Sequence, residues 1–131
     1  MQVRDHVYVT AAGPPARVYG VHTKSGSRQW EFKVQPSSAT LADLAGPLED
    51  IRGRGTVFMA VNQPASNSSF VQGLGISSGK VTWQSAALNS TQLAELELRV
   101  QHNVVLATNA AADCIIAFDA HNGTQLWNRS G

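Results

Sequence analysis

The sequence has 131 residues and a formal net charge of +1, and charged residues make up 15% of it. This length fits one domain with a hydrophobic core, and the near-neutral charge gives no electrostatic argument for binding nucleic acid. The single cysteine, Cys114, excludes an internal disulfide and a multi-cysteine metal site. No apolar run reaches the roughly 18 residues of a membrane span, and the polar segment after Met1 does not resemble a signal peptide.

The first quarter of the chain predicts three short strands. Val7–Thr10 is a β-branched and aromatic run, and further strands are expected over Val18–Thr23 and Arg28–Val34. The turn Lys24-Ser25-Gly26 joins the last two. We expect a three-residue hairpin loop in which Gly26 is left-handed and forms a bulge.

The periodicity then lapses over residues 35–48, which we interpret as an insertion between repeats. Thr40-Leu41-Ala42-Asp43 resembles a helix-capping box and Gly46-Pro47 a stop signal, so a short helical turn is expected there. The next strand is Thr56–Val61, followed by a loop from Asn62 to Ser69 that contains Pro64.

The last third of the chain contains the clearest strand pattern. Residues 95–101 alternate strictly, with Leu96, Leu98 and Val100 on one face, and Asn103–Thr108 is the strand that follows. This order of an alternating strand, an apolar strand and two further strands predicts units of four strands.

A thirteen-residue phrase occurs three times without a gap, over residues 18–30, 71–83 and 115–127. Each copy has a glycine four residues before a terminal tryptophan, and these pairs are Gly26 and Trp30, Gly79 and Trp83, and Gly123 and Trp127. An internal repeat takes precedence over other fold arguments, and a period of about 40–50 residues is typical of propeller blades.

The third copy favours a strand covered on both sides, because Ile115, Ala117, Ile116 and Phe118 make both of its faces largely apolar. Four-stranded sheets stacked around an axis bury both faces of their middle strands. The third place of the phrase is always small, and we expect this to let neighbouring sheets approach closely. The tryptophan is expected to pack on the adjacent sheet, with its indole N–H bonded to one partner.

The phrase resembles the blade repeat of pyrroloquinoline-quinone (PQQ)-type propellers, whose signature is approximately Ala-x-Asp-x-x-x-Gly-x-x-x-Trp. Residues 117–127 match every signature place, whereas the first copy has Gly20 and His22, and the second Gly73 and Gly75, for Ala and Asp. The resemblance implies an all-β propeller segment of three four-stranded antiparallel blades. It also implies that the signature residues dock one blade on the next, namely Gly26, Trp30, Gly79, Trp83, Asp119, Gly123 and Trp127.

The expected blades cover residues 1–34, 49–88 and 89–131, within a single partial propeller domain over residues 1–131. Propellers usually have four to eight blades, so three leave the ring incomplete. Because the ends of the sequence fall inside the repeat pattern, we expect a segment of a larger propeller. The alternative is a ring completed by another copy of the chain.

The function expected from these features is a non-catalytic scaffold for protein–protein contacts, with no catalytic residue, cofactor or metal. The alternative is part of a PQQ-dependent dehydrogenase, an oxidoreductase. Such enzymes typically add calcium ligands, a catalytic aspartate and often adjacent cysteines, whereas here Asp119 holds the structural place of the repeat. The four histidines show no metal-ligand spacing.

Loops on a rigid frame usually carry recognition, so we expect protein partners at Ala11–Arg17, Asn62–Ser69 and Asn109–Asp113. Four sequons make Asn67, Asn89, Asn122 and Asn128 candidates for N-glycosylation. Together with the habit of the family, they favour an extracellular, lumenal or periplasmic location. An equal case exists that an Asn/Ser/Thr-rich β-protein contains such triplets incidentally.

Overall fold

The structure is a computed structural model, and it describes most of the chain. The described residues are 2–3, 6–11, 15–35, 38–49, 55–63, 68–86, 88–89, 97–109 and 114–130. No helix occurs among them, and all strand pairs are antiparallel. The described residues include no helix of the length and apolar character that a membrane crossing needs.

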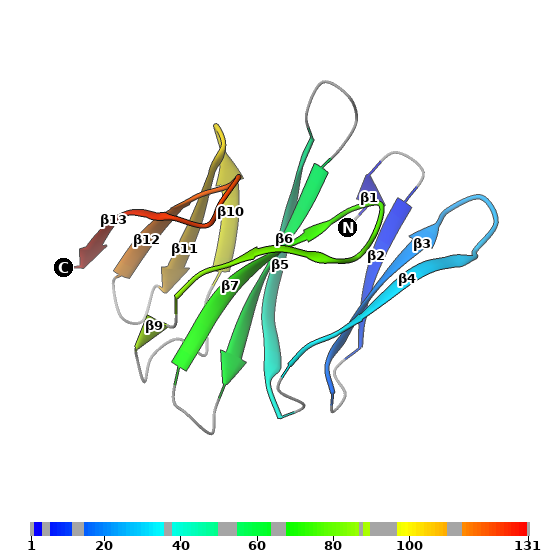
Figure 1. Cartoon of the computed structure of the whole chain (residues 1–131), viewed down its shortest axis with the longest axis horizontal. Helices are drawn as coiled ribbons and strands as arrows, with labels where there is room; N and C mark the ends of the chain where they lie inside the picture. Colours follow the sequence, from blue (N-terminus) through cyan, green and yellow to red (C-terminus); the bar gives the residue numbers. More distant parts are fainter. Residues whose placement is uncertain are drawn as a thin grey trace.

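Within the described ranges, thirteen strands form three sheets in the order of the sequence (Figure 1). The first sheet contains β1 (Gln2–Val3), β2 (His6–Ala11), β3 (Arg17–His22) and β4 (Arg28–Lys33). The second contains β5 (Thr40–Glu49), β6 (Gly55–Gln63), β7 (Ser68–Gly75) and β8 (Val81–Gln84), with β9 (Leu88–Asn89) paired to β7. The third contains β10 (Glu97–Gln101), β11 (Val104–Asn109), β12 (Cys114–Asp119) and β13 (Gln125–Ser130).

The second sheet stands between the other two, and the sheets do not close into a ring (Figure 1). The predicted fold class is therefore confirmed: an all-β propeller segment of three antiparallel blades. The grouping of all 131 residues as one partial domain stays a prediction.

Two hydrophobic clusters fill the spaces between the sheets. The cluster between the first and second sheets includes Val18, Trp30, Met59 and Leu74. The cluster between the second and third includes Phe58, Trp83, Val105 and Phe118. The five residues Val57–Val61 of β6 are all buried and alternate between the two clusters. A strand covered on both sides explains why this stretch has no polar face.

The helical turn expected at Thr40–Asp43 is wrong, because this stretch begins the ten-residue strand β5. Residues 40–48 of the expected insertion are therefore part of the second sheet. Two register shifts against β6, at Leu41/Asp43 and Ala45/Leu48, explain the error. They place Leu41 and Leu44 against one cluster and Ala42, Ala45 and Leu48 against the other, at a spacing of three that hides the period of two.

The hairpin turn of the repeat has four residues rather than the expected three. In the first sheet, the amide of His22 donates to the carbonyl of Ser27, and the amide of Gly26 donates to the carbonyl of His22. The same bonds close the turns after Gly75 and Asp119. Gly26, Gly79 and Gly123 end these turns with φ of 71°, 68° and 76°, so the left-handed conformation is confirmed. The register shifts lie in the strands before the turns, such as between Gly20 and Val21.

Candidate functional site

The indole ring of Trp30 lies on the glycine turn of the second sheet. A β-carbon at Gly79 would lie 2.4 Å from Cδ2 of Trp30, a distance that real β-carbons do not adopt. The indole N–H donates to the carbonyl oxygen of Ile76 at 2.9 Å, and the Trp30 side chain is only 8% exposed. Glycine at position 79 thus meets two needs, since it allows both the positive φ and the contact with the ring.

Trp83 repeats this arrangement one sheet further along. A β-carbon at Gly123 would lie 2.3 Å from Cε3 of Trp83, and the indole N–H donates to the carbonyl of Ala120 at 2.8 Å. The acceptor is again three residues before the glycine. Trp83 also contacts Phe58 of its own sheet, with ring centroids 5.8 Å apart. The sequence repeat is therefore also a repeat of one contact between sheets.

The small third residue of the phrase has a different role from the one expected. It does not bring neighbouring sheets together, because it lies opposite the tryptophan of its own sheet, as Gly20 pairs with Trp30 and Gly73 with Trp83. A β-carbon at Gly20 would meet Cε2 of Trp30 at 2.5 Å. The close approach between sheets occurs instead at Gly79 and Gly123.

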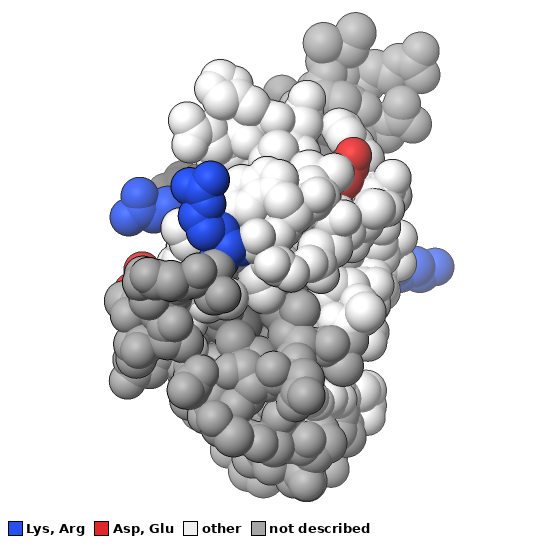
Figure 2. All heavy atoms as spheres, turned by 90° about the vertical axis from the view of Figure 1, so that its left-hand side faces the viewer, with Lys and Arg blue, Asp and Glu red and all other residues white. Residues whose placement is uncertain are grey.

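Trp127 ends the third copy, and none of the described glycine turns lies beneath it. It is 47% exposed, and its neighbours Leu126 and Ile115 are 48% and 37% exposed. Figure 2 views the molecule from the side of the third sheet, and over the described part of this face most atoms belong to uncharged residues. At the other end of the chain, a β-carbon at Gly26 would meet nothing within 4 Å. Among the described residues, Trp127 therefore has no glycine turn beneath it, and the Gly26 turn has no tryptophan above it.

Asp119 stabilises the turn that follows it. Its Oδ1 accepts a hydrogen bond from the amide of His121 at 2.8 Å, and Oδ1 of Asn122 accepts one from the amide of Thr124 at 2.9 Å. These bonds satisfy backbone donors in an exposed turn. His22, which replaces the aspartate in the first copy, lies half-buried at the end of β3. Among the described residues, His, Cys, Asp and Glu side chains form no group of three that could hold a metal ion.

Asp43 of β5 joins the second and third sheets, a role that sequence reasoning missed. Its Oδ2 accepts a hydrogen bond from the amide of Leu98 in β10 at 2.7 Å, and its Oδ1 accepts one from the amide of Leu44 at 2.8 Å. Hydrogen bonds to a charged acceptor are stronger than those between neutral groups. In the sequence, the signal for this role is an acidic residue inside a largely apolar segment.

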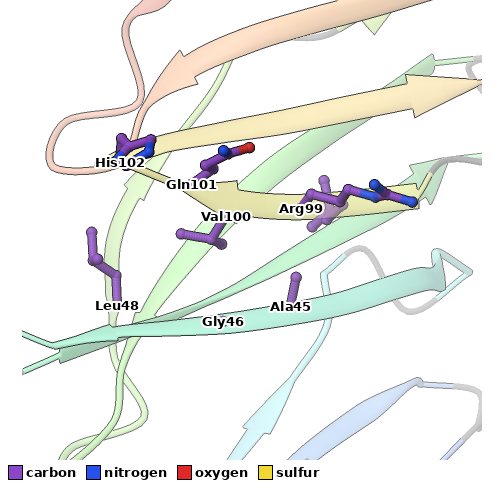
Figure 3. A pocket seen from close by; sticks show the side chains of 8 residues that line it. Ala45, Gly46, Leu48, Arg99, Val100, Gln101 and His102 are labelled. Carbon is purple, nitrogen blue, oxygen red and sulfur yellow. The ribbon is translucent and has the colours of Figure 1, made fainter.

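A cleft of about 550 Å³ lies between β5 and β10, the first strands of the second and third sheets (Figure 3). The β5 wall is apolar and the β10 side adds polar and charged side chains. The lining residues are Ala45, Gly46, Leu48, Leu98, Arg99, Val100, Gln101 and His102. His102 and Asn103 both have positive φ and form the tight turn between β10 and β11. None of these lining residues belongs to the predicted docking set.

The three predicted recognition loops hold equivalent places, because each joins the second and third strands of its sheet. Their central parts, residues 12–14, 64–67 and 110–113, lie outside the described residues. Of the predicted glycosylation positions, Asn122 and Asn128 are exposed, in the last turn and in β13. Asn89 lies in β9 and Asn67 lies outside the described residues. Modification of all four stays a prediction.

Solved structures with the same fold support the assignment of this architecture. The chain resembles BamB from Moraxella catarrhalis with a TM-score of 0.68 and 15% identity, over 99% of this chain and 34% of that one. It resembles quinohemoprotein alcohol dehydrogenase from Comamonas testosteroni with a TM-score of 0.67 and 20% identity, over 96% of this chain and 19% of that one. The chain thus spans about a third and a fifth of these two proteins. No curated protein sequence matches it.

The family model described as outer membrane protein assembly factor BamB matches residues 1–131, the whole chain. Its match agrees with the three antiparallel sheets, the repeated tryptophan contact and the two solved structures. The chain therefore belongs to this family of PQQ-like β-propellers.

Proposed function

We propose that this chain is a non-catalytic propeller segment that serves as a scaffold for protein–protein contacts within a larger protein or assembly. The observation that supports the proposal is that the residues of the repeat make structural contacts. Trp30, Trp83, Gly79 and Gly123 bring sheets together, and Asp119 holds a turn. The pattern of the repeat is therefore explained by contacts within and between the sheets.

The recognition surface that we assign is the set of loops between the second and third strands of each sheet. In antiparallel sheets of this order, these loops share one end, and the glycine turns lie at the opposite end. A rigid frame that presents variable loops on one side is a common way to build a binding surface. The name of the matched family, an outer membrane protein assembly factor, supports a protein partner and a location at or beside an outer membrane.

Site-specific photo-crosslinking tests this proposal in cells that express the full-length protein. A photoreactive amino acid is placed at Ala11 or Gln63, which border the loops, and in matched controls at Ser25 or Ser78, which are exposed in the glycine turns at the opposite end. We expect discrete crosslinked proteins from Ala11 and Gln63 and not from the two serines. The same products from both ends, or none from the loop positions, would contradict the proposal.

The dehydrogenase alternative rests on the likeness of fold to the Comamonas enzyme. It is tested on the full-length protein by adding PQQ and calcium and measuring quinone absorbance and reduction of an artificial electron acceptor with alcohols. The scaffold proposal expects neither signal. Substrate-dependent dye reduction would overturn it in favour of an enzyme.

A further inference from the structure

Asn122 and Gly123 form the only Asn-Gly pair in the sequence, and they lie in the turn between β12 and β13. In such a pair the main-chain nitrogen of the glycine can attack the side-chain amide of the asparagine, because glycine has no side chain to shield that nitrogen. The Asn122 side chain is exposed, so water reaches it. This turn therefore holds the reactants for deamidation as well as the contact with Trp83.

The reaction needs water and no oxidant or cofactor. The nitrogen of Gly123 gives its proton to water or hydroxide and forms a bond to Cγ of Asn122. The bond from Cγ to Nδ2 breaks, and the side-chain nitrogen takes up a proton and leaves as ammonia. Water then opens the cyclic succinimide at either of its carbonyl carbons. The products are aspartate or isoaspartate, and in isoaspartate the main chain gains an extra carbon atom.

The folded turn keeps the two reacting groups engaged elsewhere. The amide of Gly123 donates to the carbonyl of Asp119 at 2.8 Å, and Oδ1 of Asn122 accepts a hydrogen bond from the amide of Thr124 at 2.9 Å. For the attack, Gly123 must give up its hydrogen bond and its peptide plane must turn towards the asparagine side chain. The turn must therefore open before the bond can form.

Trp83 resists that opening from the second sheet. Its ring lies so close that a β-carbon at Gly123 would be 2.3 Å from Cε3, and its indole N–H donates to the carbonyl of Ala120 at 2.8 Å. The Trp83 side chain is buried. The indole thus holds the turn at both Ala120 and Gly123, and turning the Gly123 peptide would push it against the ring.

We propose that Asn122 is a deamidation site whose rate is set by the docking of Trp83, so that the contact between the second and third sheets protects it. The reaction then occurs from the state in which the ring has left the turn. When the turn closes faster than the chemistry proceeds, the rate follows the population of this open state. This inference does not depend on the proposed scaffold function.

The modification would make a brief opening permanent. Isoaspartate lengthens the main chain directly before Gly123, whose φ of 76° and missing side chain make room for the indole. The carbonyl of Ala120 and the glycine then no longer have the spacing that the ring of Trp83 contacts. A chain that reacts in the open state cannot redock in the same way, which is an irreversible loss of stability.

A second Asn-Gly pair in the same molecule provides the control. Ser78 holds the place of Asn122 directly before Gly79, and Trp30 covers that turn as Trp83 covers the other. The Ser78 hydroxyl accepts a hydrogen bond from the amide two residues later at 3.3 Å, as the Asn122 side chain does at 2.9 Å. Ser78→Asn in the full-length protein therefore gives two reactive pairs under different tryptophans.

Trp83→Phe and Trp30→Phe are compared in the Ser78→Asn background, in protein without glycans. Each removes one indole N–H but keeps a ring in the core, so the sheets should stay folded, which circular dichroism checks. Peptide mapping by mass spectrometry after incubation at neutral pH measures amide loss at positions 122 and 78 separately. We expect Trp83→Phe to speed the reaction roughly three- to tenfold at position 122 only, and Trp30→Phe at position 78 only.

The chain unfolded in guanidinium chloride gives the unprotected rate, which should exceed that of the folded protein at least about tenfold at both positions. Equal acceleration at both positions in either variant would overturn the proposal, because modification would then follow unfolding of the whole chain. So would a rate at Asn122 that Trp83→Phe leaves unchanged, or a folded protein that reacts there as fast as the unfolded chain.

Discussion

Trp30 and Trp83 differ from Trp127 in their surroundings, although all three end the same phrase of sequence. The first two are 8% exposed and each donates its N–H to a carbonyl of the following sheet, whereas Trp127 is 47% exposed. The phrase therefore encodes half of a contact, and the following sheet supplies the other half. We infer that a tryptophan of this repeat adds most to stability where the next glycine turn is present to receive it.

The glycines show the same difference from the other side of the contact. Gly79 and Gly123 lie beneath indole rings, while Gly26 faces open space, although the three have the same backbone conformation. Turn geometry alone therefore favours glycine at all three positions, but close packing requires it at only two. This separates the conformational role of the residue from its role in docking.

The largest expected effect comes from removing a docked ring. Trp83→Ala should lower the free energy of unfolding by about 3–5 kcal/mol, because it opens a cavity beside Phe58 and leaves the carbonyl of Ala120 without its donor. Trp127→Ala, at a position 47% exposed, should change it by less than about 1 kcal/mol. Urea unfolding followed by circular dichroism compares the two variants, and equal losses would contradict the account.

Filling the space beneath a ring should have the next largest effect. Gly123→Asn should destabilise the chain by roughly 1–3 kcal/mol more than Gly26→Asn, because only at position 123 does the new side chain displace an indole. The cost of a positive φ is common to both and cancels in the difference. Thermal and urea unfolding of the pair measure it, and indistinguishable stabilities would argue against close packing at Gly123.

Substitution of Asp43 tests whether the hydrogen bond between β5 and β10 helps to hold the second and third sheets together. Asp43→Ala leaves the amide of Leu98 without its acceptor and should cost about 1–3 kcal/mol. Asp43→Asn keeps an oxygen acceptor and should cost less. Hydrogen exchange at the Leu98 amide provides a local readout, which should quicken in the alanine variant. An unchanged rate would show that this bond does not hold β10.

The smallest effect is expected on the outward side of the first sheet. Glu31→Gln removes the charge that pairs with Arg17, but both side chains are about 30% exposed. Exposed pairs contribute roughly 0–1 kcal/mol, so the free energy of unfolding should change by less than about 1 kcal/mol. A larger loss in urea unfolding would mean that this face is as important for stability as the apolar ones.

The fold could be predicted from the sequence because the repeat places glycine and tryptophan at fixed spacing. The alternation at Leu98 and Val100 likewise gave the strand β10. The strand β5 could not be recognised, because its two register shifts remove the period of two, and Gly46 with a φ of 101° lets the strand continue where glycine and proline suggested an end.

The site was less predictable, since it depends on which partner each residue meets. Nothing local to Gly20 indicates that its neighbour is Trp30 of the same sheet rather than another sheet. Asp43 meets Leu98 across 55 residues of sequence, a contact that only the stacking of sheets creates. The openness of Gly26 and Trp127 likewise follows from their positions in the stack and not from their own sequence.

Exchange of the three indole N–H protons with solvent measures whether each tryptophan is held by the following glycine turn. The measurement uses NMR on the 131-residue chain, with the Trp127→Phe variant to assign one signal. We predict slow exchange for Trp30 and Trp83, whose N–H groups are bonded to carbonyls of the next sheet, and fast exchange for Trp127. Equal exchange of all three, or fast exchange of Trp30 or Trp83, would contradict the claim that each tryptophan is held by the following glycine turn.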